Sequence, residues 1–97
     1  MRFGVHELEP NKHHSNEQYL GFFPNGFGAS VIRGTYTYGG DRGLFELGVI
    51  RGVPSDWHLT YDTPVTSDVV GFLTADEVRE LLVRSEALPT AVEVPHV

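Results

Sequence analysis

A glycine-rich segment with two tyrosines and an arginine is the first candidate for a binding site. Residues 34–43 read GTYTYGGDRG and contain Tyr36, Tyr38 and Arg42. Aromatic rings can stack on a planar ligand, and a guanidinium can pair with an anion. The segment lacks the Lys and the Ser or Thr of a phosphate-binding P-loop. Because glycine clusters between strands commonly form turns, a plain hairpin loop is the simpler interpretation, and ligand binding is the alternative.

A second candidate is the segment YDTPVTSD, residues 61–68, which contains Asp62, Thr63, Thr66 and Asp68 and no basic residue. Its hydroxyls and carboxylates could bind an arginine or the backbone of a partner, or a cation. The same side chains could instead cap local N–H groups in a rigid connection from strand to helix, which is the interpretation we favour. Two carboxylates six residues apart in a loop do not define an acid–base pair.

Other combinations of reactive residue types lack the context that catalysis needs. Ser55, Asp56 and His58 suit nucleophilic catalysis by type, but they lie in a turn and a strand without a nucleophile elbow. Residues 26–31 match half of a dinucleotide-binding pattern, yet a strand continues where the helix should begin. We therefore predict that the protein is not an enzyme and that it holds no cofactor.

The histidines do not define a metal site. His6, His13 and His14 lie near Glu7 and Glu9, but no helical HExxH spacing fixes a geometry and the chain has no cysteine. We predict no structural or catalytic metal.

Period-two alternation predicts four strands that position these segments, at residues 19–23, 27–33, 44–51 and 57–61. Asn25 and Gly26 indicate a two-residue type I′ turn between the first two strands. Gly28 and Gly48 leave one face of their strands without a side chain, so the sheet bends there or another group approaches the backbone closely. We favour the bend.

A helix follows the fourth strand. Thr74 and Glu77 form a capping box, and Pro89 marks the end of the helix. The side chains expected to pack on the sheet are Val78, Leu81, Leu82 and Leu88. The fold class predicted is α+β, a four-stranded antiparallel meander with one C-terminal helix packed on one face. We expect an N-terminal arm at residues 1–17 that needs a partner for order, one domain at 18–91 and a tail at 92–97.

Composition limits the class of protein further. The chain has 97 residues, of which 40% are hydrophobic, and no cysteine. This is enough for one small core, and it excludes a disulfide framework and a cysteine nucleophile. No apolar run approaches the roughly 20 residues of a membrane span, and the first residues lack the apolar region of a signal peptide. We expect a protein of the cytoplasm that does not contact membranes.

The net charge of -6 is uneven along the chain. Residues 1–60 carry five basic and six acidic side chains, whereas residues 61–97 carry two basic and seven acidic ones. The basic residues form no stripe, so we expect no direct binding of duplex nucleic acid. The acidic excess is either a solvated helix face or a surface complementary to a basic partner.

Three stretches of the chain resemble a known group of proteins. They read FPNGFGASVIR, YGGDRGLFELGVIRG and LTYDTPVTSDVVGFLTADEVRELL. Together, over residues 19–88, they resemble a family of short, uncharacterised proteins encoded by tailed bacteriophages and prophages. The resemblance implies a phage setting, in which small acidic proteins outside the virion often bind and redirect or block a host component. It implies no activity and assigns no functional residue.

These features lead us to expect a non-enzymatic phage accessory protein that acts in the host cytoplasm and modulates or inhibits a host macromolecule, with a host protein as the first choice. The candidate contact residues are Tyr36, Tyr38, Arg42, Asp62, Thr63, Thr66 and Asp68. A second hypothesis is an oligomer that sequesters a nucleotide signal at the tyrosine loop, and a third is a minor structural component of the virion. The open edges of a four-stranded sheet lead us to expect a homodimer.

Overall fold

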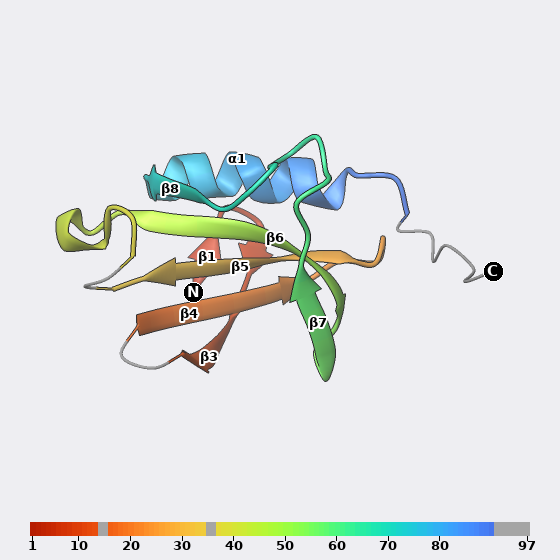
Figure 1. Ribbon diagram of the computed structural model, residues 1–97, viewed down its shortest axis with the longest axis horizontal. Coiled ribbons are helices and arrows are strands. Elements are labelled where there is room, and N and C mark those ends of the chain that lie inside the picture. Colours follow the sequence, from red (N-terminus) through yellow and green to blue (C-terminus); the bar gives the residue numbers. More distant parts are fainter. Residues whose placement is uncertain (14–15, 35–36, 91–97) are drawn as a thin grey trace.

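Short strands and a helix follow one another along residues 1–13, 16–34 and 37–90, the part of the chain that the computed structural model describes. Near the N-terminus, β1 (Arg2–Phe3) and β2 (His6–Glu7) form a small ribbon. The larger sheet contains β3 (Glu9–His13), β4 (Asn16–Phe22), β5 (Phe27–Arg33), β6 (Phe45–Val53), β7 (Asp56–Leu59) and β8 (Val70–Leu73). A 3-10 turn, η1 (Gly40–Arg42), precedes β6, and α1 (Ala75–Glu86) follows β8 (Figure 1).

The strands of the larger sheet pair antiparallel in the order β3-β4-β5-β6-β7, and β8 pairs with the first part of β6. The α+β class, with an antiparallel sheet and one C-terminal helix, is confirmed, but the four-stranded meander is wrong. The expected strands correspond to β4, β5, β6 and β7, and the structure adds β3 and β8 at the edges. Neither addition shows a period-two apolar pattern, since β3 reads EPNKH and β8 reads VGFL.

The N-terminal residues belong to the fold, where the sequence led us to expect an arm. Phe3 and Leu8 are buried in the core. The N-terminal amine donates to Leu8 O at 3.0 Å, and Leu8 N donates to Met1 O at 2.9 Å. The Phe3 ring meets the Phe45 ring edge-on, with the centroids 5.2 Å apart. The sequence did not indicate this packing, because the segment is mostly polar. Only two of its apolar side chains, Phe3 and Leu8, belong to the core. The expected tail at 92–97 lies outside the described residues.

The turn between β4 and β5 is not the type I′ turn expected. Gly26 N donates to Phe23 O at 3.2 Å, so Pro24 and Asn25 occupy the central positions of the turn. Gly26 takes a left-handed φ of 86°, whereas Asn25 does not take a positive φ. A turn followed by one left-handed glycine is typical of three-residue hairpin loops.

The side chain of Asn25 in this turn caps the end of α1. Its Nδ2 donates to the carbonyl oxygens of Ser85, Glu86 and Leu88 at 2.9, 3.1 and 3.0 Å, and its Oδ1 accepts from Phe27 N at 3.0 Å. The last carbonyls of a helix have no partner within the helix, so a buried donor at this position stabilises the helix end. The hairpin and the helix are thereby joined.

The other end of α1 has the capping box that the sequence predicts. Thr74 Oγ1 accepts from Glu77 N at 3.2 Å, and Glu77 Oε1 accepts from Thr74 N at 3.0 Å. The apolar face of α1 packs on the core through Val78, Leu81 and Leu82, and Leu88, two residues past the helix, packs there as well. With 12 residues α1 is too short to cross a bilayer, and no other helix in the described part of the chain could do so.

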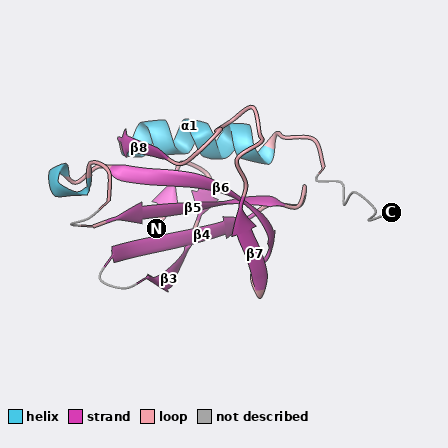
Figure 2. Cartoon of the chain, viewed as in Figure 1, coloured by secondary structure: helices cyan, strands magenta, loops and turns pink. Residues whose placement is uncertain are grey.

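The core lies between α1 and one face of the sheet (Figure 2). Ala29 and Val31 of β5 and Leu47 and Val49 of β6 are fully buried there. Because successive side chains of a strand point to opposite faces, residues 28, 30 and 32 and residues 46, 48 and 50 lie on the other face. We call this second face the open face, since α1 does not cover it.

Candidate functional site

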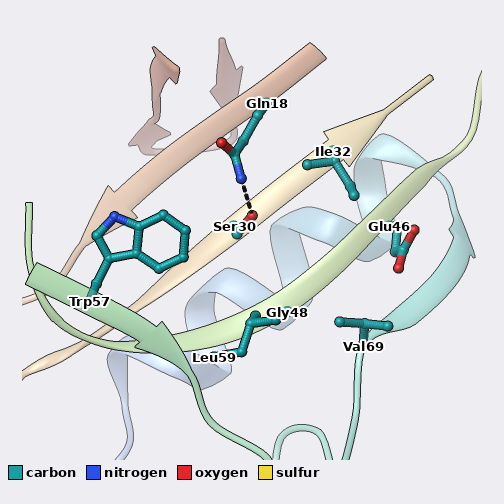
Figure 3. Close-up of a pocket in the computed structure, with 8 residues that line it drawn as sticks. All are labelled: Gln18, Ser30, Ile32, Glu46, Gly48, Trp57, Leu59 and Val69. Carbon is teal, nitrogen blue, oxygen red and sulfur yellow. Dashed lines mark hydrogen bonds between the residues drawn. The ribbon is translucent and has the colours of Figure 1, made fainter. Parts of the chain in front are cut away.

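A pocket on the open face is the best-formed candidate for a binding site. It has a volume of about 200 Å³. Strands β4, β5, β6 and β7 and the residue before β8 supply its lining, which comprises Gln18, Ser30, Ile32, Glu46, Gly48, Trp57, Leu59 and Val69 (Figure 3). In that view α1 lies behind the sheet, so the pocket opens on the side away from the helix. We call it the open-face pocket.

Three polar side chains in the lining are almost completely buried. Gln18 is 5% exposed, and Ser30 and Glu46 are each 8% exposed. Gln18 Nε2 donates to Ser30 Oγ at 3.0 Å, and Gln18 Oε1 accepts from Asn11 Nδ2 at 2.7 Å. This chain of hydrogen bonds crosses β3, β4 and β5 and gives both the nitrogen and the oxygen of the Gln18 amide a partner within the protein.

Among the described residues that line the open-face pocket, Glu46 is the only charged one. Its Oε2 accepts from Tyr38 N at 3.3 Å, so the glycine-rich loop helps to hold the carboxylate. The Tyr38 carbonyl in turn accepts from Phe72 N at 3.1 Å, which ties the loop to β8. Phe72 has a φ of 58° and an exposed side chain, a rare conformation for a bulky residue.

Apolar side chains line the rest of the pocket. Trp57 and Leu59 project from β7 onto the open face, and their strand partners in β6 are Gly52 and Ile50. A Cβ built on Gly48 would lie 2.6 Å from Leu59 Cδ2, so Leu59 approaches the backbone closely. The close approach, which we did not favour, therefore explains Gly48. In Figure 3 Trp57 and Glu46 lie toward opposite ends of the pocket.

A second hollow of about 220 Å³ lies on the same face, toward β3. Its lining comprises Glu9, Pro10, Asn11, Leu20, Phe22 and Pro54. The hydrogen bond between Asn11 and Gln18 joins a residue of this hollow to a residue of the open-face pocket. Neither lining contains a Lys or an Arg, and each contains one glutamate. The described residues of the two linings are therefore mostly apolar, and their charged members are the two acidic residues Glu46 and Glu9.

The described side chains of the tyrosine loop lie away from the two hollows of the open face. The side chain of Tyr38 is 62% exposed, and Arg42 is exposed in η1. Neither lines the open-face pocket or the hollow beside it. Tyr36 lies outside the described residues. What the loop contributes to the pocket is the main-chain N–H of Tyr38.

The segment 61–68 uses most of its polar groups locally. Thr66 N donates to Thr63 Oγ1 at 3.2 Å, and Val69 N donates to Asp68 Oδ1 at 2.7 Å. The Thr60 hydroxyl donates to Asp62 Oδ1 at 2.6 Å, and this bond lowers the pKa of the Asp62 carboxyl below its ordinary value. Such bonds are typical of a rigid connection.

Two of the predicted contact residues in that segment do line a surface hollow. Asp62 and Thr63 belong to a hollow of about 220 Å³ near the end of α1, together with Phe27, Arg51, Pro64, Leu88, Pro89 and Thr90. Thr66 is buried, with its Oγ1 unpartnered among the described residues, and Asp68 is exposed. The structure thus separates the predicted contact residues into several places.

The residue types that suit catalysis lie at the surface, and those that suit metal binding form no cluster in the described part of the chain. Ser55, Asp56 and His58 are all exposed around the turn that starts β7. Among the described residues no three His, Asp or Glu side chains lie close enough together to hold a metal ion. His6 is buried beside α1, where its Nε2 lies 3.3 Å from Glu86 Oε1.

Comparison with known proteins adds no assignment. No protein-family model matches the chain, and no curated protein or solved structure is significantly similar to it.

The sequence contained partial signals for the open-face pocket. The alternation in β5 and β6 separates Ser30 and Ile32 from the core positions, and it places Glu46 and Gly48 on the same face. Gln18 escaped notice because it lies in a strand that begins three residues before the expected one. Only the pairing of four strands brings these residues together.

Proposed function

We propose that the chain is a non-enzymatic binding protein that holds a partner protein on the open face of its sheet. The observation that carries the proposal is the open-face pocket, in which apolar side chains surround three buried polar ones. Pockets of this composition are typical of binding sites. Tryptophan is also enriched among the residues that contribute most to protein interfaces, and Trp57 is the only tryptophan in the chain.

A protein fits this face better than a nucleotide does. The volume of about 200 Å³ is below the roughly 300–1,000 Å³ of pockets for drug-sized ligands. The neighbouring hollow extends the surface toward β3, which suits a partner that contacts several points. The nucleotide hypothesis rests on the tyrosine loop, of which no described side chain belongs to either lining.

The biological setting that we propose comes from the resemblance to tailed-phage proteins. In this setting the chain is an accessory protein in the host cytoplasm, and the partner is a host protein whose activity it modulates or inhibits. The acidity of the chain supports a partner with a basic surface. We also propose a homodimer, because β3 and the β7 and β8 strands remain as sheet edges.

Quantitative affinity capture with matched variants tests the proposed function. Trp57→Ala removes the indole from the open-face pocket, whereas His58→Ala changes an exposed neighbour on the opposite face of β7. We expect the same host protein to be recovered with the natural chain and with His58→Ala, and its yield to fall at least about tenfold with Trp57→Ala. Equal yields with both variants would contradict the proposal.

Further measurements separate the proposal from its alternatives. If Trp57→Ala proves unfolded by circular dichroism, Ile32→Ser changes the lining from β5 and replaces it in the comparison. A nucleotide at a hundred times its dissociation constant would add about 2.7 kcal/mol to the unfolding free energy, which a thermal-shift panel detects. Retention in purified particles would support the virion hypothesis, and native mass spectrometry reports the number of subunits.

A further inference from the structure

We propose that the open-face pocket receives a basic side chain, Arg or Lys, of the partner protein, with the Glu46 carboxylate as its counter-charge. This inference rests on the proposed function and names the chemistry of the partner at that face.

The first argument is the environment of Glu46. Glu46 is 8% exposed as a residue, and burial of a charged side chain is costly unless charge or hydrogen bonds compensate. The hydrogen bond that it accepts from Tyr38 N is long, at 3.3 Å. The carboxylates that form ion pairs among the described residues are those of Glu7, Glu17, Asp76 and Glu86. Glu46 therefore has acceptor capacity left for a cation that enters the pocket.

The second argument is that the other buried polar side chains of the pocket are neutral and already form hydrogen bonds within the protein. Ser30 Oγ accepts from Gln18, and Gln18 Oε1 accepts from Asn11. These neutral groups are bonded to one another and leave Glu46 as the charged group that a ligand can address. A ligand that gains binding energy in this pocket should thus carry a positive charge.

The third argument is the shape of the apolar lining. Ile32, Leu59 and Val69 line the pocket together with Trp57, which lies toward the end away from Glu46 (Figure 3). Arg and Lys carry a charged head on a long aliphatic stem, and such stems pack favourably on apolar surface. A basic side chain can therefore reach Glu46 while its stem contacts the apolar side chains.

The charges around the pocket favour the same class of partner. No Lys or Arg stands among the described residues of either open-face lining, and the hollow toward β3 adds Glu9. With a net charge of -6 the whole chain attracts a basic segment and speeds its encounter.

The experiment is a titration of the full-length ¹⁵N-labelled protein with short blocked peptides, followed by nuclear magnetic resonance. The peptides read Gly-Ser-X-Ser-Gly, where X is Arg, Lys or the neutral Arg analogue citrulline. We expect the Arg and Lys peptides to shift the Trp57 indole and Gly48 amide signals saturably. The citrulline peptide should bind at least about tenfold more weakly, because its head carries no charge.

Glu46→Gln is the test variant, and Glu80→Gln on the exposed side of α1 is the control with the same loss of charge. A Gln side chain keeps an oxygen that can accept from Tyr38 N, so the fold should persist. We expect the dissociation constant of the Arg peptide to rise at least about tenfold in Glu46→Gln and to stay unchanged in Glu80→Gln.

Three results would overturn the inference: no shift with either basic peptide, equal binding of the Arg and citrulline peptides, or equal binding by Glu46→Gln and the natural chain. Each of these leaves the proposed function standing if capture of a host protein still depends on Trp57. If the yield of the captured host protein did not depend on Trp57, the proposed function itself would be contradicted.

Discussion

The side-chain amide of Asn25 donates to the carbonyl oxygen of Ser85 at 2.9 Å, across 60 residues of sequence. Asn25 lies in the hairpin turn between β4 and β5, and Ser85 lies in the last turn of α1. The Ser85 hydroxyl itself donates back to Leu81 O at 2.8 Å within the helix. The FPNG motif thus has a structural role, which is to close the end of the helix that covers the core.

We predict that Asn25→Ala lowers the free energy of unfolding by about 1 to 3 kcal/mol, because it leaves the last carbonyls of α1 without their buried donor. Chemical denaturation followed by circular dichroism measures the change. Pro24→Ala, at the exposed neighbouring position, should change it by no more than about 0.5 kcal/mol. Equal stability of the two variants would show that the cap contributes little.

Leu8→Ala should destabilise the protein by about 2 to 5 kcal/mol, because Leu8 is completely enclosed by the core and its removal leaves a cavity. Val5→Ala is the matched control, since the Val5 side chain is 81% exposed. The midpoints of urea unfolding of both variants provide the comparison. If both behave like the natural chain, the N-terminal residues do not contribute to the core.

The capping box at Thr74 should make part of the stability dependent on pH. The hydrogen bond from Thr74 N lowers the pKa of Glu77 below its ordinary value of 4.5. A carboxyl whose pKa is lowered by folding stabilises the folded state above its unfolded pKa, and this contribution is lost as the pH falls through the folded pKa. Glu77→Ala, which removes this carboxylate, should therefore destabilise the protein at pH 7, with a cost that becomes smaller below pH 4.5.

Denaturation of the natural chain and of Glu77→Ala at a series of pH values tests this dependence. Thr74→Ala keeps the main-chain donor, and the loss of its N-cap hydroxyl should cost about 0.5 to 2 kcal/mol at pH 7. A difference between the natural chain and Glu77→Ala that does not change with pH would indicate that Glu77 takes no part in the box.

The contact between Gly48 and Leu59 can be tested with a double-mutant cycle. Gly48→Ala should cost about 1 to 3 kcal/mol, because the new Cβ meets the Leu59 side chain. In a Leu59→Ala background the same change should cost less, since the obstructing methyl group is gone. Unfolding free energies of the four chains give the coupling energy. A cost of Gly48→Ala that is the same in both backgrounds would place the two residues out of contact.

The parts of the fold that depend on local pattern could be predicted from the sequence. The Thr74 capping box needs only residues three positions apart, and the alternation around Val31 and Leu47 needs only one strand at a time. The two strands that the sequence did not indicate, β3 and β8, could not be predicted in this way. β3 contains Pro10 and few apolar residues, and it forms because five of its residues pair with β4.

The candidate site depends on contacts that no local pattern encodes. Gln18, Ser30 and Glu46 lie in three different strands, and the register of those strands alone brings them to one pocket. Gly48 and Trp57 could be assigned to one site only if the order of the strands in the sheet were already known. The contact between the glycine-rich loop and Glu46 could not be predicted either, because it is made by the main-chain N–H of Tyr38.

The position of α1 at the end of the fold has a consequence for how the protein is made. Strands β1 to β8 emerge from the ribosome before the helix, so the apolar side of the sheet, with Val31 and Leu47, stays uncovered until synthesis passes Leu82. The Asn25 cap forms only after Leu88 has been added. A pause in translation between β8 and α1 would thus leave the apolar face of the sheet exposed to solvent. In such a state aggregation competes with folding.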